Sequence, residues 1–132
     1  LCNNKKIVIL FKIMNESKNL LERIKEGIQE KKGKNIVIAD LTNIEDTICN
    51  YFIICNGNSP SQVMAITESI KDYVRTETGI KPFAVDGTKN SQWVAMDYGD
   101  IIAHVFLPEQ RNFYNLEHLW ADAKLTQIPD LD

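Results

Sequence analysis

The spacing of apolar residues along the chain predicts an alternation of helices and strands. Four apolar residues between Leu20 and Ile28 recur at helical spacing and Gly33 follows them, which predicts a first helix over about 16–32. Two mostly continuous apolar runs come next, NIVIADL over 35–41 and YFIIC over 51–55. Runs of this kind are typical of strands that are covered on both faces of a sheet.

The second helix has a start signal of its own. Ser59-Pro60-Ser61-Gln62 is a capping box, in which the Ser59 side chain accepts a hydrogen bond from the backbone N–H of Gln62 and the Gln62 side chain reaches back. Pro60 occupies the first helical position, where its missing N–H costs nothing. An apolar stripe follows at helical spacing, and Gly79 closes the helix.

The stretch WVAMDYGDIIAHVF (93–106) predicts a β-hairpin that follows a short strand over 81–85. With Tyr98-Gly99 as the loop, Trp93 lies opposite His104 and Asp97 lies opposite Asp100. Strand alternation then places Trp93, Asp97, Asp100, His104 and Phe106 on one side of the hairpin. The other side is wholly apolar and is expected to be core; it carries Val94, Met96, Ile101, Ala103, Val105 and Leu107.

The last third of the chain completes the predicted domain. After Pro108, the segment EQRNFYNLEHLWADAK predicts a helix, or two short turns broken at Asn115, and the tail LTQIPDLD is expected to be frayed. The pattern predicts a single α/β domain with a mixed five-stranded sheet covered on both faces. We expect a non-family N-terminal extension over 1–13, the domain over 14–123 and a C-terminal tail over 124–132.

Composition and charge narrow the classes of function. The 132 residues are 44% hydrophobic and 25% charged, as in an ordinary globular domain. The formal net charge of −3 disfavours a protein whose main partner is a phosphate backbone, because such binding needs clustered Lys and Arg. The three cysteines lack metal-site spacing, and Cys55 is expected to be a buried structural thiol in a reducing cytoplasm. No stretch approaches the length of a membrane span.

Two features could carry chemistry. ICNGNSPSQ (54–62) joins a strand to a helix start and resembles a phosphate cradle, although it lacks the Lys of a P-loop. Asp97 and Asp100 could meet around a metal ion, but solvated turn flanks are the more ordinary interpretation. His104 and His118 are too few and too far apart in the sequence to predict a metal site. We therefore expect no cofactor and no metal.

The run SQWVAMDYGDIIAHVFLPEQRNFYNLEHLWADA (91–123) closely resembles the ribosomal silencing factor family, also called the Iojap-like family. The block ADLTN…NYFIICNGNSPSQV (39–63) resembles the other signature of that family, so the resemblance covers about 18–123. It implies a fold similar to a nucleotidyltransferase that has lost its catalytic acids, and hence a protein that is not an enzyme. Asn50, Asn56 and Ser61 stand where many members have Asp, Thr and Arg.

The resemblance also implies a function in translation. Family members are typically homodimers that bind the fourteenth protein of the large ribosomal subunit, on the face that meets the small subunit. Bound there, they prevent subunit joining and slow translation when nutrients are scarce. For this chain, the resemblance implies a bacterial cytoplasmic protein with little direct contact to nucleic acid.

The contact surface implied for this chain is the Trp/His side of the hairpin together with the segment that follows it. Trp93 would be the desolvated anchor, and the acidic residues would face a basic ribosomal protein. The expected partner-binding residues are Trp93, Asp97, Tyr98, Asp100, His104, Phe106, Leu107, Pro108, Glu109, Tyr114, Leu116 and Trp120. Two alternatives stay open: a small metal-dependent nucleotidyltransferase that uses Asp97 and Asp100, and a dimeric scaffold unrelated to ribosomes.

Overall fold

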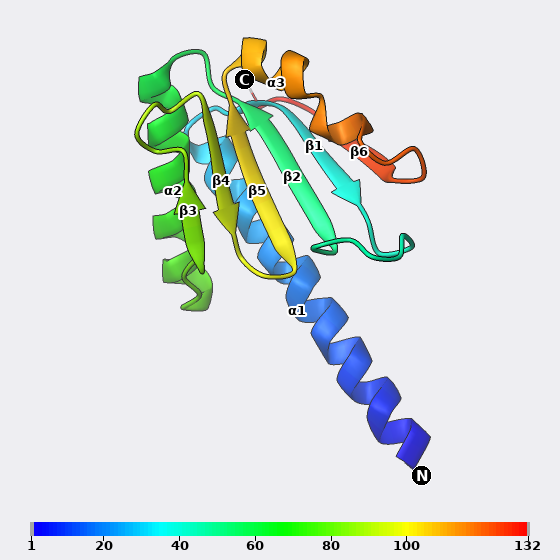
Figure 1. Ribbon diagram of the computed structural model, residues 1–132. Helices are drawn as coiled ribbons and strands as arrows, with labels where there is room; N and C mark the ends of the chain where they lie inside the picture. Colours follow the sequence, from blue (N-terminus) through cyan, green and yellow to red (C-terminus); the bar gives the residue numbers. More distant parts are fainter. Residues whose placement is uncertain (1, 132) are drawn as a thin grey trace.

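The structure is a computed structural model that describes residues 2–131, and the side chains of residues 5–12 and 15–131. Its helices and strands follow one another along the chain in a single α/β arrangement (Figure 1). The elements are α1 (Cys2–Glu30), β1 (Lys34–Asp40), β2 (Tyr51–Asn56), α2 (Pro60–Thr78), β3 (Ala84–Asp86), β4 (Trp93–Asp97), β5 (Ile101–Phe106), α3 (Pro108–Tyr114), the 3₁₀ helix η1 (Leu116–His118) and β6 (Lys124–Ile128).

The strands form one mixed sheet in the order β3-β4-β5-β2-β1-β6. β2 and β5 are parallel, and the other neighbouring pairs are antiparallel. The predicted α/β class and mixed sheet are confirmed, but the predicted count of five strands is wrong. The sixth strand, β6, comes from the tail that was expected to be frayed. Its backbone pairs with β1, from Lys124 opposite Asp40 to Ile128 opposite Ile36.

The two long helices, α1 and α2, pack against each other on one face of the sheet (Figure 1). Between them and the strands lies the larger core, which includes Ile24, Ile53, Ile70 and the fully buried Cys55. Cys55 is fully buried, as predicted, and burial raises the pKa of its thiol to about 12. The opposite face is covered by the short elements α3 and η1 and by loop segments, so the prediction of a sheet covered on both faces is confirmed.

The face opposite to α1 and α2 is called the front face here. Its strand residues are nevertheless largely buried, because side chains from α3, η1 and the 41–50 loop fold over the sheet. A second core cluster results, made of Ala39, Leu41, Cys49, Phe52, Ile54 and Phe106, with Ile44, Trp93, Ile102, Leu116, Trp120 and Ala123 packed against it. The continuous apolar run of β2 is thus explained by two cores of different construction.

Helix α1 begins at Cys2, well before the predicted start at about residue 16. Residues 2–15 contain neither Pro nor Gly, so nothing in the backbone ends the helix there. The described side chains of 5–12 are exposed, and this part of α1 projects beyond the rest of the molecule (Figure 1). Within residues 2–131, no helix has the length and apolar character needed to cross a bilayer.

The capping box of α2 is confirmed with one change of partner. Ser59 Oγ accepts from the backbone N–H of Gln62 at 3.1 Å, and Gly79 ends the helix with a φ of 76°. The Gln62 carboxamide oxygen accepts from the backbone N–H of Asn58 at 2.6 Å, while its nitrogen donates to the backbone carbonyl of Lys31 at 3.3 Å. Gln62 therefore also ties the start of α2 to the end of α1.

The β4–β5 hairpin closes one residue later than predicted. Trp93 pairs with Phe106 rather than with His104, so that Gly99-Asp100 forms the loop in place of Tyr98-Gly99. Gly99 has a φ of 88°, which suits the first position of a type II′ turn. Because the register moves by two residues, the strand side chains keep their predicted faces. The apolar side is confirmed as core.

Candidate functional site

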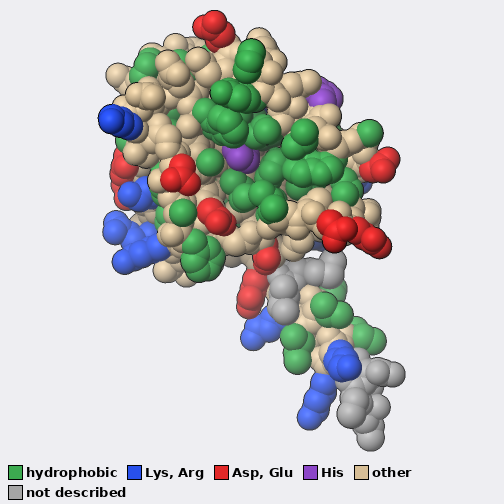
Figure 2. Space-filling view, in the orientation of Figure 1, with side chains coloured by type: hydrophobic (Ala, Val, Ile, Leu, Met, Phe, Trp, Pro, Cys, Tyr) green, Lys and Arg blue, Asp and Glu red, His purple; other side chains and the backbone are tan. Residues whose placement is uncertain are grey.

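The front face presents a cluster of aromatic side chains around a histidine. β5 supplies His104 and Phe106, β4 supplies Trp93, and β2 supplies Phe52. Strand alternation brings these side chains to the same face, because their positions match in register across the three strands. Figure 2 shows the result as a broad hydrophobic surface in which a histidine is visible, with acidic side chains near its border.

Trp93 is held in place by three neighbours. Its Nε1 donates a hydrogen bond to His104 Nδ1 at 3.0 Å. Its ring stacks on Phe106, with centroids 5.0 Å apart and an interplanar angle of 20°, and it contacts Tyr114 at a centroid distance of 4.7 Å. Trp93 itself is half-buried. An indole that is fixed in orientation and still partly exposed is suited to act as a binding anchor.

His104 lies beneath this surface and is 5% exposed. Desolvation lowers the pKa of its imidazole to about 4, so the ring is neutral at physiological pH. Its ring meets Phe52 edge-on, with centroids 4.7 Å apart. Phe52 in turn contacts Trp120, with centroids 5.4 Å apart.

The segment from α3 to Trp120 carries the most exposed apolar groups beside this cluster. Phe113 is 80% exposed, Leu119 61% and Tyr114 49%. Phe113 contacts Tyr114 edge-on, and Tyr114 contacts Trp93, so the exposed aromatic groups are continuous with the front face. A contiguous, exposed apolar patch on a folded protein marks an interaction surface.

The structure brings together most of the residues that were expected to bind a partner. Trp93, His104, Phe106, Tyr114, Leu116 and Trp120 belong to the front-face cluster or touch it. Asp97 shares this face by strand alternation, and Pro108 and Glu109 are exposed at the start of α3. His104 and Phe106 support the surface from below, because both are buried.

Three of the expected residues do not lie on the front face. Tyr98 is only 4% exposed and belongs to the core beneath α1 and α2. Asp100 turns to the helix side, where its Oδ2 accepts a hydrogen bond from Ser17 Oγ of α1 at 3.1 Å. Leu107 packs against the helix-side core. The shifted hairpin loop explains the change for Asp100, which the sequence pattern had placed opposite Asp97 and on the same side as Trp93.

The two acids considered for a metal site have separate structural hydrogen bonds, one within the hairpin turn and one to α1. Asp97 Oδ1 accepts from the backbone N–H of Gly99 at 2.8 Å, while Asp100 bonds to α1. Among the residues whose side chains are described, no group of three or more His, Cys, Asp or Glu is placed to hold a metal ion.

The cradle-like loop over 57–59 is also far from these acids. In the parallel pair, Tyr51 lies beside Ile101 and Asn56 beside Phe106. The hairpin loop precedes β5 and the 57–59 loop follows β2, so the length of a strand, about 17–20 Å at roughly 3.3 Å per residue, separates them. This geometry disfavours the alternative of a nucleotidyltransferase that combines Asp97 and Asp100 with that loop.

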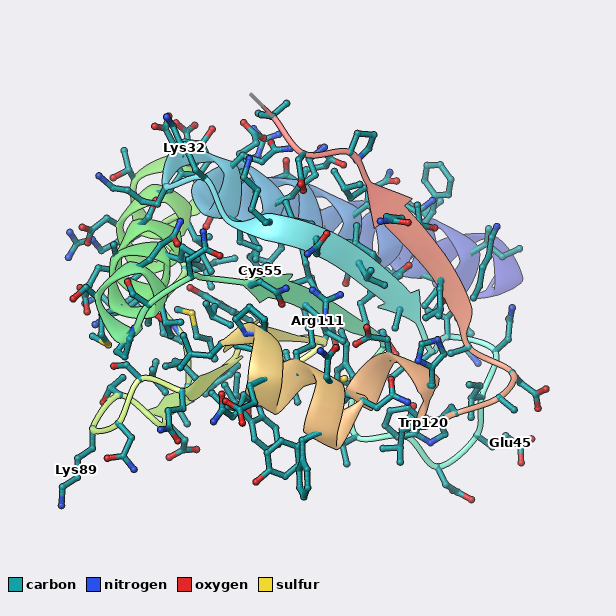
Figure 3. The ribbon with its side chains drawn as sticks, turned by 90° about the horizontal axis from the view of Figure 1, so that it is seen from above. Lys32, Glu45, Cys55, Lys89, Arg111 and Trp120 are labelled. Carbon is teal, nitrogen blue, oxygen red and sulfur yellow. The ribbon has the colours of Figure 1, made fainter. Side chains whose placement is uncertain are left out.

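Sequence reasoning missed Phe52 of the cluster and the buried Arg111. Arg111 is 6% exposed; its Nη1 donates to Asn56 Oδ1 at 2.9 Å and its Nε to Glu117 Oε1 at 3.3 Å. Figure 3 shows Arg111 between α3 and the strands β1 and β2. A polar pocket of about 480 Å³ opens beside it, lined also by Asn35 and by residues of β6. Asn56, one of the departures from the family pattern, is thus firmly bonded in this chain.

Nothing in the sequence pattern signalled these two residues. Phe52 reaches the site only through the parallel pairing of β2 with β5, which joins segments about fifty residues apart. Arg111 lies on the short helix α3, and its burial depends on how α3 packs on the end of the sheet.

Comparison with known proteins agrees with the fold and with the motifs. Residues 14–132 match the family described as ribosomal silencing factor during starvation. The ribosomal silencing factor of Bacillus subtilis (strain 168) is 38% identical over 111 residues, which cover 84% of this chain and 92% of that protein. The chloroplastic protein Iojap of Zea mays is 37% identical over 79 residues, which cover 60% of this chain and 34% of that protein.

A solved structure extends the agreement to three dimensions. The crystal structure of a protein from Chromobacterium violaceum matches with a TM-score of 0.73 at 28% identity, covering 85% of this chain and 92% of that one. Fold, motifs and relatives therefore lead to one assignment: the chain belongs to the ribosomal silencing factor family.

Proposed function

We propose that this protein represses translation by binding the large ribosomal subunit through its fourteenth protein and blocking the approach of the small subunit. The family assignment supports the link to ribosome silencing. The observation that carries the choice of surface is the front face, where a half-buried Trp93 is fixed by His104 and Phe106 and borders exposed aromatic groups. Blocking then requires no chemistry, only occupancy of a surface that the small subunit must touch.

The charge of the chain supports a basic protein as the partner. Asp97 shares the face of Trp93, Glu109 is exposed in the first turn of α3, and the formal net charge is −3. Acidic groups around an apolar centre favour a basic protein surface over the neighbouring ribosomal RNA, whose phosphates repel them. Direct contact with nucleic acid is therefore a minor part of the proposed interface.

The resemblance to the family also supports a homodimer, which we include in the proposal. The measured mass of the purified protein in solution tests this part separately from ribosome binding.

Sucrose-gradient fractionation tests the proposed function. Purified large subunits are incubated with the protein, small subunits are then added, and the fractions are analysed for protein and for joined ribosomes. We expect the protein to sediment with free large subunits and to reduce the peak of joined ribosomes. Sedimentation only at the top of the gradient would contradict the proposal and favour the scaffold unrelated to ribosomes.

A further inference from the structure

His104 has one ring nitrogen bonded and one without a partner. Nδ1 accepts the hydrogen bond from Trp93 Nε1 at 3.0 Å. Nε2 is buried and has no hydrogen-bond partner among the described residues. An unsatisfied polar atom is uncommon in a folded protein, because burial removes its bonds to water without replacing them.

The bond to Trp93 fixes which nitrogen of His104 carries the proton. An indole N–H can only donate, so Nδ1 of His104 must accept and cannot carry a hydrogen. Since the buried ring is neutral, its one proton lies on Nε2. The unpartnered atom is therefore a hydrogen-bond donor, and its orientation is set by the same contact that fixes Trp93.

The surroundings of His104 contain aromatic rings. Trp93 and Tyr114 form one contacting pair beside the ring, and Phe52 and Trp120 form another. Tyr114 is 49% exposed and Trp120 is half-buried, so neither ring is fully enclosed by the protein.

We infer that His104 Nε2–H donates a hydrogen bond to a carbonyl oxygen of the bound partner protein, which enters between Tyr114 and Trp120. The inference rests on the proposed function, since it concerns the same front face. Trp93 supplies apolar contact and His104 supplies one directed bond at the centre of that contact. A buried donor of this kind discriminates against surfaces without a matching acceptor, because they would leave it unpaired.

Two substitutions separate the two nitrogens of His104. In His104→Asn, the side-chain oxygen replaces Nδ1 as acceptor for Trp93, but the distal donor is lost. In His104→Gln, the carboxamide nitrogen reaches the position of Nε2 and retains the distal donor. Binding of each variant to the purified fourteenth protein of the large subunit is measured by calorimetry. The intrinsic fluorescence of the two tryptophans, Trp93 and Trp120, and thermal unfolding report whether each variant is folded.

We expect His104→Asn to be folded and to bind about tenfold or more weakly than the unmodified protein, whereas His104→Gln binds within about threefold of it. Equal binding by a folded His104→Asn protein and the unmodified protein would overturn the inference while leaving the proposed function intact. An equal loss in both variants would also overturn it. Absence of binding by the unmodified protein would instead contradict the proposed function.

Discussion

At the scale of single residues, His104 shows how burial determines both charge and hydrogen bonding. Its ring is enclosed by Trp93, Phe52 and Phe106, and desolvation lowers the pKa of the imidazole from 6.5 to about 4. Between pH 6.5 and about 4, this histidine is thus neutral in the folded protein but protonated in the unfolded chain. The stability of the fold must therefore depend on pH.

The sign of this dependence follows from the lowered pKa. Between pH 6.5 and about 4 the unfolded state binds more protons than the folded state, so stability is complete above pH 6.5 and falls as pH decreases. We expect His104 to account for a loss of about 2 kcal/mol in the free energy of unfolding between pH 7 and pH 5. Urea unfolding at both pH values, compared with the His104→Asn variant, isolates this contribution. Equal losses in the two proteins would show that His104 does not titrate in this way.

Side-chain faces were easier to predict than pairing. The alternation along β4 and β5 placed Trp93, His104 and Phe106 on one side, and a shift of register by two residues left that assignment correct. The prediction of Tyr98-Gly99 as the loop was wrong, because Gly99 is acceptable at either position of a two-residue turn. The side chain of Asp100 then followed the loop to the helix side. The burial of Tyr98 was missed for the same reason.

At the scale of elements, β6 is the main difference from the sequence-based expectation. The sequence LTQIPDLD lacks the apolar alternation that predicts a strand. In the structure, the residues of β6 are mostly exposed. The strand exists because β1 offers an open edge and because the residues beyond it are tied down. Asp130 Oδ1 accepts from the backbone N–H of Asn35 at 2.9 Å, and the backbone carbonyl of Leu131 accepts from Lys34 Nζ at 3.1 Å.

Deletion of residues 124–132 tests the contribution of β6. It removes five backbone pairs with β1 and leaves β1 as an unprotected edge. We expect a loss of about 1–3 kcal/mol in the free energy of unfolding, together with greater aggregation. Asp130→Ala, which removes one exposed hydrogen bond, is the control and should cost less than about 1 kcal/mol. Unchanged stability of the truncated protein would contradict this prediction and would indicate that the tail is frayed.

Deletion of the projecting part of α1, unlike deletion of β6, is expected to leave the stability of the fold unchanged. The side chains of Ile7, Val8, Ile9, Leu10 and Phe11 are 57–65% exposed, so they contribute little to the fold. We expect deletion of residues 1–13 to leave the melting temperature and partner binding unchanged, and to improve solubility because an exposed apolar segment is removed. Thermal unfolding and the binding titration check this. A fall of more than a few degrees in the melting temperature would show that the segment packs on the fold. Weaker binding would show that it contacts the ribosomal partner.

At the scale of the whole molecule, the two faces of the sheet are built differently. α1 and α2 cover one face and enclose the larger core, while the front face is closed by short elements, loops and aromatic side chains. The sequence pattern predicted the α/β class, both long helices and five of the six strands. It could not predict the strand order, because the parallel pairing of β2 with β5 depends on contacts between distant segments.

The central claim is that the front face binds the ribosomal partner, and Trp93→Ala tests it most directly. The variant is titrated against the purified fourteenth protein of the large subunit, and its urea unfolding is measured in parallel. Phe83→Ala is the control, because Phe83 is an aromatic residue that is 80% exposed and lines a groove beside α2. Trp93 is half-buried, so its truncation should cost less folding stability than the roughly 3–5 kcal/mol of a buried aromatic residue.

We expect Trp93→Ala to lose about 2–4 kcal/mol of binding free energy, the range of a central anchor, while the protein stays folded. Phe83→Ala should bind like the unmodified protein. A folded Trp93→Ala protein that binds the partner with unchanged affinity would contradict the assignment of the front face.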